Sequence, residues 1–195
     1  MSPLALREPV PIRPEWPRYA PQVPFPRYRY VRGLNPHPVS DPRGNSHGVR
    51  PEPKAWHPSD WRHNEFYLFG VDLYNFAYWW EAHEYWEELW HLTDKNGPLG
   101  QFLQGLIQVS ACAIKWHEHA PDGVRRLSEE GSGRLETSRA AADSEGWLMG
   151  IHLPGHLKAI REFYRPFVEG QYTETSWQKT DGFPLIRLEA TERPA

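Results

Sequence analysis

The sequence predicts an all-α protein, a compact irregular bundle of about five helices with an extended, proline-rich N-terminal arm. From Ser59 onward, apolar residues recur at helical spacing between segments rich in glycine, proline and aspartate. Before that point, residues 1–58 hold fourteen of the twenty prolines, each of which removes a backbone donor and disfavours helix in its predecessor. We therefore divide the chain into an arm (1–58), a helical domain (59–170) and a C-terminal tail (171–195).

The arm has more aromatic residues than a solvated linker, namely Trp16, Tyr19, Phe25, Tyr28, Tyr30 and Trp56. The charge is also uneven, because residues 1–60 carry nine Lys/Arg against five Asp/Glu and the remainder thirteen against twenty. We therefore expect an extended arm laid over the helical body and fixed there by its rings. The alternative is a disordered proline-rich segment.

The first helices have recognisable start and stop signals. Ser59 or Asp60 is the expected cap of a first helix, and a break at 74–78 leads into a second helix at 79–92. Gly97 suits a left-handed helix end, and Pro98 prevents continuation. A third helix at 99–117 is apolar on most faces, so we expect other helices to surround it.

The later elements follow in order. A fourth helix starts after Pro121 and continues to about Ala142, either unbroken or interrupted at 131–133. A fifth helix begins near Pro154, a residue favoured in the first turn. In the tail, residues 183–188 suit a short strand or a docked extended segment.

The second helix has the densest combination of aromatic and ionisable residues. At 100° per residue the acidic residues share one face, and the other, broad face holds Trp79, Ala82, Tyr85, Trp86, Leu89 and Trp90. The position of His83 is on the boundary between these faces, beside Glu87. A titratable group at the edge of an aromatic wall is well placed for ligand contact. We expect Glu81, Glu84 and Glu88 to form a solvated acidic face.

The third helix carries a narrow polar strip in which Gln104 and Gln108 lie one turn apart. A buried amide needs a partner, and the boundary formed by His83 and Glu87 is the best candidate. Three arrangements remain open: a buried network that fixes helix register, a pocket floored by Trp79, Trp86 or Trp90, and strips that do not meet. The candidate binding residues are His83, Glu87, Gln104, Gln108 and Trp90.

A divalent metal is the cofactor that these residues suggest. His83-Glu84-x-x-Glu87 resembles the zinc motif His-Glu-x-x-His, with His83 and Glu87 as candidate ligands and Glu84 as candidate general base. Glu88 and His91 form one Glu-x-x-His element of the kind that di-iron bundles use in pairs. Further imidazoles occur as His117 with His119 and His152 with His156.

Composition argues against other classes. The net charge of −3 argues against a nucleic-acid binder, and no apolar run is long enough to span a membrane. Leu4 to Leu6 is too short for the apolar core of a signal peptide, and the single Cys112 excludes an internal disulfide, so we expect a cytoplasmic location. Cys112 lies in the apolar helix and suits an inert core residue. Ten tryptophans favour an aromatic core or a dimer interface.

Two blocks resemble a known family. They are Glu81-Ala-His-Glu84-x-x-Glu87-x-x-Trp90 and Gln104-Gly-Leu-Ile-Gln108, and the chain is similar to the bacterial and archaeal domain-of-unknown-function family 309 over about residues 63–130. The resemblance implies a small all-helical fold and no established activity. It also implies one constellation of five residues: His83, Glu84, Glu87, Gln104 and Gln108.

The sequence therefore favours a cytoplasmic, non-catalytic helical module that binds a partner chain or a small polar ligand beside His83. The partner is unknown and could be another protein or a second copy of the chain. The alternative function is a divalent-metal-dependent hydrolase with His83 and Glu87 as ligands and Glu84 as base.

Overall fold

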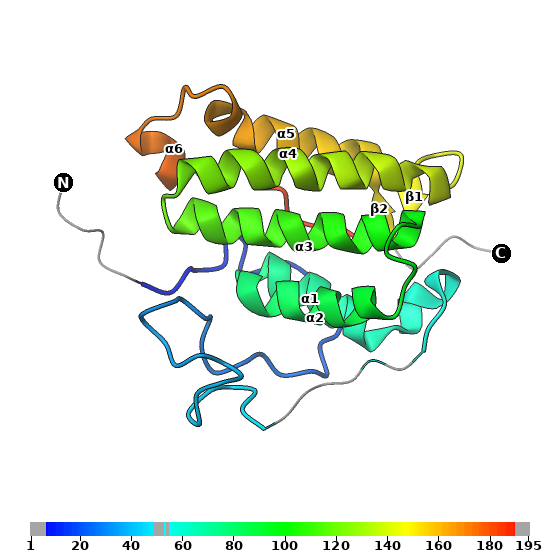
Figure 1. Ribbon diagram of the computed structural model, residues 1–195, viewed down its shortest axis with the longest axis horizontal. Helices are drawn as coiled ribbons and strands as arrows, with labels where there is room; N and C mark the ends of the chain where they lie inside the picture. The colour runs from blue at the N-terminus through cyan, green and yellow to red at the C-terminus, as the bar shows by residue number, and fades with distance from the viewer. Residues whose placement is uncertain (1–6, 49–52, 54, 190–195) are drawn as a thin grey trace.

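The computed structural model describes residues 7–48, 53 and 55–189. The ends of the predicted arm and tail, including Leu4 to Leu6, and the short stretches at 49–52 and 54 lie outside the described residues. Within this part the chain is mostly helical, as predicted. Its main helices are α1 (Glu65–Asn75), α2 (Trp79–His91), α3 (Pro98–His117), α4 (Pro121–Ser138) and α5 (Leu153–Val168) (Figure 1).

Each of these helices packs against the next one in the chain. α3 lies at the centre, with α2 and then α1 on one side and α4 on the other, and α5 packs on α4 (Figure 1). The apolar surface of α3 explains this position, since both of its flanks must be covered. Tyr67, Tyr74, Trp86, Phe102 and Tyr164 are among the largest fully buried side chains, so the core is rich in aromatic rings.

Short elements complete the bundle. Two 3-10 helices occur at Pro58–His63 and Arg139–Ala141, and a small helix α6 (Glu174–Gln178) follows α5. The strands β1 (Trp147–Leu148) and β2 (Ile151–His152) pair antiparallel just before α5. No helix in the described part of the chain combines the length and apolarity needed to cross a bilayer.

Two local expectations need correction, and a third is confirmed. Asn64 caps α1 by accepting a hydrogen bond from Tyr67 N at 3.0 Å, whereas Ser59 and Asp60 lie in the preceding 3-10 helix. Gly97 has φ −74° and precedes Pro98 at the start of α3, so it is not a left-handed end of α2. The predicted break at 74–78 is present, with Ala77 at φ 65°.

The α3–α4 contact explains why α4 continues without a break through its glycines. A Cβ on Gly105 would lie 2.7 Å from Leu135 Cγ, and a Cβ on Gly131 would lie 3.0 Å from Val109 Cγ2. These glycines therefore let the two backbones approach closely, which compensates for their low helix propensity.

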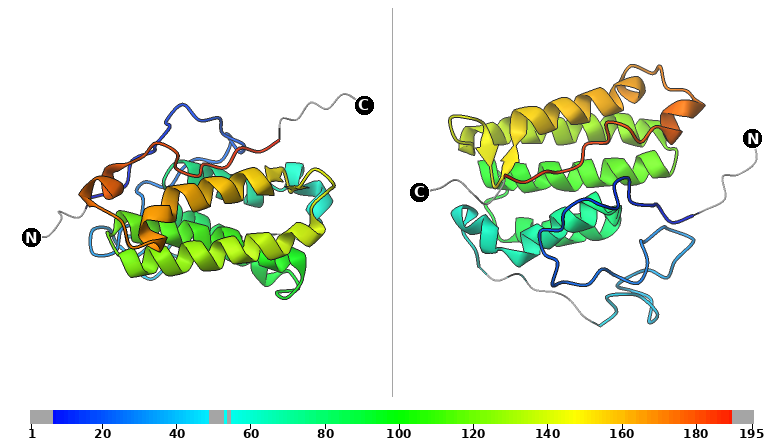
Figure 2. Two further views of the ribbon diagram at one scale, coloured as in Figure 1. Left: turned by 90° about the horizontal axis from the view of Figure 1, so that it is seen from above. Right: turned by 180° about the vertical axis from the view of Figure 1, so that it is seen from behind.

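The described part of the arm lies on the face of α1 and α2 (Figure 2). The side chain of Asp72 on α1 is fully buried and accepts from Tyr19 N at 2.7 Å and Ala20 N at 2.9 Å, while Arg18 Nε lies 3.2 Å away. Phe25 stacks on the Tyr78 ring at 4.9 Å. The arm is therefore held by an ionic anchor and by packed rings.

The tail segment 183–188 docks beside the arm in extended form (Figure 2). The Asn75 side chain bonds both to Ile186 O and to Ile186 N at 2.8 Å, and Leu188 forms an isolated antiparallel bridge with Ile151. Trp16 Nε1 of the arm also donates to Ile186 O. The two extended segments are therefore joined to each other and to the bundle.

Candidate functional site

The structure brings three of the predicted residues together on α2. Ligand atoms of His83, Glu84 and Glu87 all lie within 4.8 Å of one another, and His83 Nδ1 is 3.3 Å from Glu84 Oε1. The three side chains are half-buried, with 28% of the His83 side chain and 38% of the Glu84 side chain exposed. Such a group is shielded from bulk water but remains accessible to an ion or a small ligand.

Glu84 differs from its sequence-based placement. The helical projection put it on the outer acidic face, yet its carboxylate lies against the neighbouring imidazole. A projection places Cα atoms, whereas a glutamate side chain has three rotatable bonds and reaches around the helix surface. The structure therefore groups Glu84 with His83 and Glu87.

The inner face of α2 fixes the position of this group. Ser110 Oγ of α3 donates to Trp79 O at 2.6 Å, and the fully buried Trp86 indole packs so closely on α1 that a Cβ on Gly70 would lie 2.4 Å from its Nε1. Leu89 is also fully buried one turn later. These contacts fix the position of α2, and therefore the position of His83 at the half-buried side of the helix.

The two glutamines are not joined to this group by hydrogen bonds. Gln108 Nε2 donates to Glu130 Oε2 of α4 at 3.1 Å, and its amide oxygen is buried without a partner in the described residues. Gln104 is half-buried on α3, and no side-chain hydrogen bond of the described chain involves it. Trp90 is half-buried near the end of α2, where Lys95 Nζ lies 4.1 Å from its ring centroid.

A cavity of about 450 Å³ adjoins His83 between α2, α3 and the arm. Three rings form one wall: Tyr30 and His37 of the arm and Trp80 of α2 lie edge to face at 5.1–5.4 Å between centroids. Lys115 lines the same cavity and pairs with Glu118 at 2.6 Å. Of the five candidate binding residues, His83 is the one that lines this cavity.

Four of the residues that line this cavity were not predicted from the sequence: Tyr30, His37, Trp80 and Lys115. The aromatic content of the arm was the available signal, but it indicated docking and not the position of each ring. Periodicity reports the faces of one helix, so it cannot place an arm residue opposite a residue about fifty positions later. The structure was therefore needed to identify these lining residues.

Glu81 corrects the expectation of a solvated acidic face. It is only 5% exposed because the arm covers it, and Tyr30 N donates to its Oε1 at 3.0 Å. Its Oε2 is buried with no partner in the described part of the chain. Burial is the main cause that raises the pKa of this carboxyl to about 7, although the Tyr30 N–H and the Arg29 charge oppose it.

The remaining candidate ligands have separate surroundings. His152 accepts a hydrogen bond from Gly155 N at the start of α5, whereas His156 is buried, so this pair does not form a common metal site. His117 Nε2 lies 2.8 Å from Arg7 O, and the His119 ring stacks on Trp177 at 4.6 Å. In the described part of the chain, His83, Glu84 and Glu87 form the one group of three or more close potential ligands.

Cys112 lies in the core, as expected for an inert thiol. It is fully buried on α3, and its Sγ lies 3.4 Å from Val124 O. Burial raises the pKa of the thiol, so the reactive thiolate is disfavoured.

A known family matches the segment that carries the candidate residues of α2 and α3. Residues 67–127 match the family model described as domain of unknown function (DUF309). This match confirms the resemblance over α1 to the first turns of α4, which includes both sequence blocks. Searches of curated proteins and of solved structures gave no match.

Proposed function

We propose that this protein is a helical binding module that holds a divalent metal ion at His83, Glu84 and Glu87. The observation that carries the proposal is the mutual distance of their ligand atoms, all within 4.8 Å. Two of the three residues were candidate ligands from sequence, and Glu84 joins them here as a third ligand.

The donor set supports an ion such as Zn²⁺, Mn²⁺ or Fe²⁺. One imidazole and two carboxylates combine a nitrogen donor with hard oxygen donors, which these ions accept. Three protein ligands also leave coordination positions for water or for a bound molecule. The cavity beside His83 favours a small polar ligand at one of these open coordination positions, since Tyr30, His37 and Lys115 offer polar groups in the cavity.

Metal binding is tested by titrating Zn²⁺ and Mn²⁺ into metal-stripped protein in a calorimeter. We expect one ion per chain, and we expect the affinity to fall by at least about tenfold in His83→Ala and Glu87→Gln, because each change removes a ligand. His91→Ala is the matched control, since His91 is an exposed histidine on the same helix, outside the group.

A failure of this proposal would be clear. If the unaltered protein binds neither ion, or if His91→Ala weakens binding as much as His83→Ala, the group is not a metal site. A large fall in the melting temperature of His83→Ala without any metal binding would instead support a structural role for the half-buried imidazole.

A second candidate function is a metal-dependent hydrolase, as the sequence also suggested. The observation that favours it is the exposure of Glu84 next to the His83 imidazole, since a solvent-accessible carboxylate beside a metal can act as general base. Under the hydrolase hypothesis, His83 and Glu87 hold the ion and Glu84 is not a ligand. Bound metal would lower the pKa of a coordinated water towards neutrality.

Glu84→Gln separates the two functions. A ligand role predicts weaker metal binding, whereas a base role predicts intact metal binding with loss of hydrolysis of a phosphoester or amide substrate. Absence of hydrolysis by the metal-loaded unaltered protein would argue for the binding module.

The cytoplasm is our proposed location, because a single cysteine fits a reducing compartment. A protein partner or a second copy of the chain remains a further proposal. Light scattering after size-exclusion chromatography would test the second of these.

A further inference from the structure

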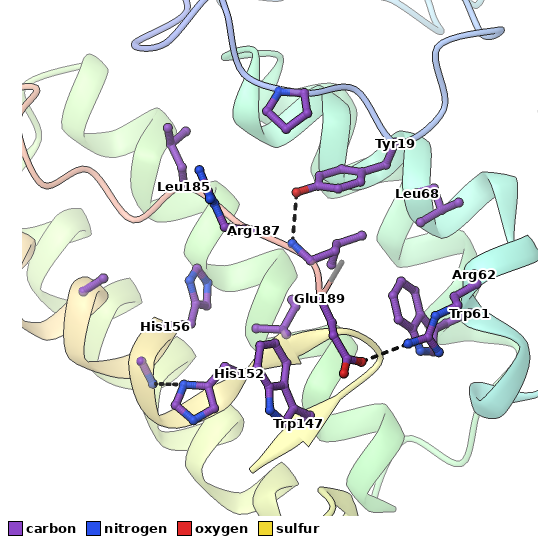
Figure 3. A pocket seen from close by; sticks show the side chains of 15 residues that line it. Tyr19, Trp61, Arg62, Leu68, Trp147, His152, His156, Leu185, Arg187 and Glu189 are labelled. Atoms are coloured by element: carbon purple, nitrogen blue, oxygen red, sulfur yellow. Dashed lines mark hydrogen bonds and ion pairs between the residues drawn. The ribbon is translucent and has the colours of Figure 1, made fainter. Parts of the chain in front are cut away.

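A second cavity lies away from the α2 group. Its volume is about 710 Å³, within the range of small-molecule sites, and none of its lining residues belongs to α2. It opens where the arm, the first 3-10 helix, the β1–β2 hairpin, α5 and the docked tail meet (Figure 3). Its walls therefore come from parts of the chain that are distant in sequence.

Most of the wall is apolar and aromatic. The Trp147 ring is tilted against the His152 ring at 5.1 Å on the hairpin side, and Leu68, Ile151, Leu185 and Leu188 add aliphatic surface. Trp61 of the first 3-10 helix also lines the cavity (Figure 3), and it packs so closely on the hairpin that a Cβ on Gly150 would lie 2.3 Å from its ring. A cavity with indole walls favours a flat ring system.

His156 provides a buried polar group in this wall. The residue is 7% exposed, and its Nε2 is buried without a hydrogen-bond partner among the described residues. Burial lowers the pKa of this imidazole to about 4, so the ring is neutral at neutral pH. A neutral imidazole has one donor and one acceptor nitrogen, and an unmatched buried one is unfavourable unless a ligand atom satisfies it.

The charges at the cavity differ in how they are compensated. Arg62 Nη2 pairs with Glu189 Oε2 at 2.9 Å, so these two lining charges offset each other. Arg187 lies over the Trp16 ring at 4.8 Å and is exposed, with no carboxylate partner among the described residues. One uncompensated guanidinium therefore lines the cavity, and its planar fork matches a carboxylate.

We propose that this cavity binds a small planar aromatic carboxylate. The ring would lie against Trp147 in the apolar part, the carboxylate would bind Arg187, and a polar atom of the ligand would bond to His156. This site is separate from the α2 group, so the proposal does not depend on metal binding there.

The test is calorimetric titration of the full-length protein with 2-naphthoate as a minimal probe. We expect one probe molecule per chain, and about tenfold or greater loss of affinity in Arg187→Gln, because a charge-assisted bond is lost. Arg165→Gln is the matched control, because Arg165 is exposed on α5 and does not line the cavity. This variant should bind 2-naphthoate as tightly as the unaltered protein does.

Two further ligands separate charge recognition from ring burial. The neutral 2-naphthamide should bind the unaltered protein more weakly than 2-naphthoate does. Its affinity should be the same for the unaltered protein and for Arg187→Gln. Trp147→Leu should weaken both probes, with an unchanged circular dichroism spectrum as proof of folding. The proposal is overturned if 2-naphthoate does not bind, if Arg187→Gln binds it as tightly as the unaltered protein, or if 2-naphthylmethylammonium binds better.

Discussion

Glu81 is a carboxyl group enclosed by the arm, with one oxygen bonded to Tyr30 N and the other without a partner in the described residues. Its pKa is 4.5 as an ordinary side chain and about 7 in the folded protein. Between these values the folded state keeps a proton that the unfolded state has lost. The contribution of Glu81 to the free energy of unfolding therefore falls as the pH rises from about 4.5 to about 7.

Glu81→Gln removes this penalty and keeps an oxygen to accept from Tyr30 N. We expect the variant to be more stable than the unaltered protein at pH 8, by on the order of 3 kcal/mol, with no gain near pH 4. Urea unfolding in metal-free buffer at pH 4, 6 and 8 measures this difference. His156, whose lowered pKa has the opposite effect on stability, is present in both proteins and cancels. Equal stabilities at pH 8 would contradict the assignment.

The residues of α2 also show which side-chain positions can be predicted from the sequence. His83 and Glu87 were identified correctly as neighbours because they are four residues apart on a helix. Glu81 was misplaced because the segment that buries it, at Tyr30, is about fifty residues away. Glu84 was misplaced because a helical projection does not include side-chain rotamers.

At the scale of elements, glycines in helices α3 and α4 have different surroundings. Gly105 faces the fully buried Leu135 across the helix contact, whereas a Cβ on Gly133 would meet nothing within 4 Å. The two positions therefore separate the effect of packing from that of helix propensity.

Alanine substitutions at these positions should have opposite effects. Gly133→Ala should raise the free energy of unfolding by about 0.5–1 kcal/mol, because alanine has the higher helix propensity. Gly105→Ala should lower it by about 1–2 kcal/mol, because a clash of about 1–3 kcal/mol outweighs that gain. Urea denaturation followed by circular dichroism measures both. Stabilisation by Gly105→Ala would show that α3 and α4 separate at little cost.

Element positions were predicted better than element ends. α2, α3 and α5 follow from their apolar spacing, and the fully packed α3 follows from its lack of a broad polar face. Gly97 was assigned to the end of α2, although Pro98 favours the first turn of α3 equally well. The continuity of α4 depends on its contact with α3, which its own residues do not reveal.

For the molecule as a whole, the arm connects the two candidate sites. Tyr30 and His37 line the cavity beside His83, and Tyr19 lines the larger cavity. Tyr19 OH also accepts from Leu188 N of the tail, at 3.0 Å. A change that loosens the arm should therefore affect both cavities without altering most of their lining residues.

Asp72 is the residue with which to test this dependence, because it is fully buried on α1 and lines neither cavity. Asp72→Asn replaces one acceptor oxygen by a donor amide. This amide faces either the Tyr19 N–H, or both the Arg18 guanidinium and the Ala20 N–H. We expect a loss of about 2–3 kcal/mol in stability. We also expect faster trypsin cleavage after Arg27 and Arg29 and weaker binding of 2-naphthoate. Glu65→Gln is the control, since its bond with Gln22 of the arm is exposed. If Asp72→Asn lowers stability but leaves cleavage of the arm and probe binding unchanged, the arm is held mainly by its packed rings, and the ionic anchor serves α1 alone.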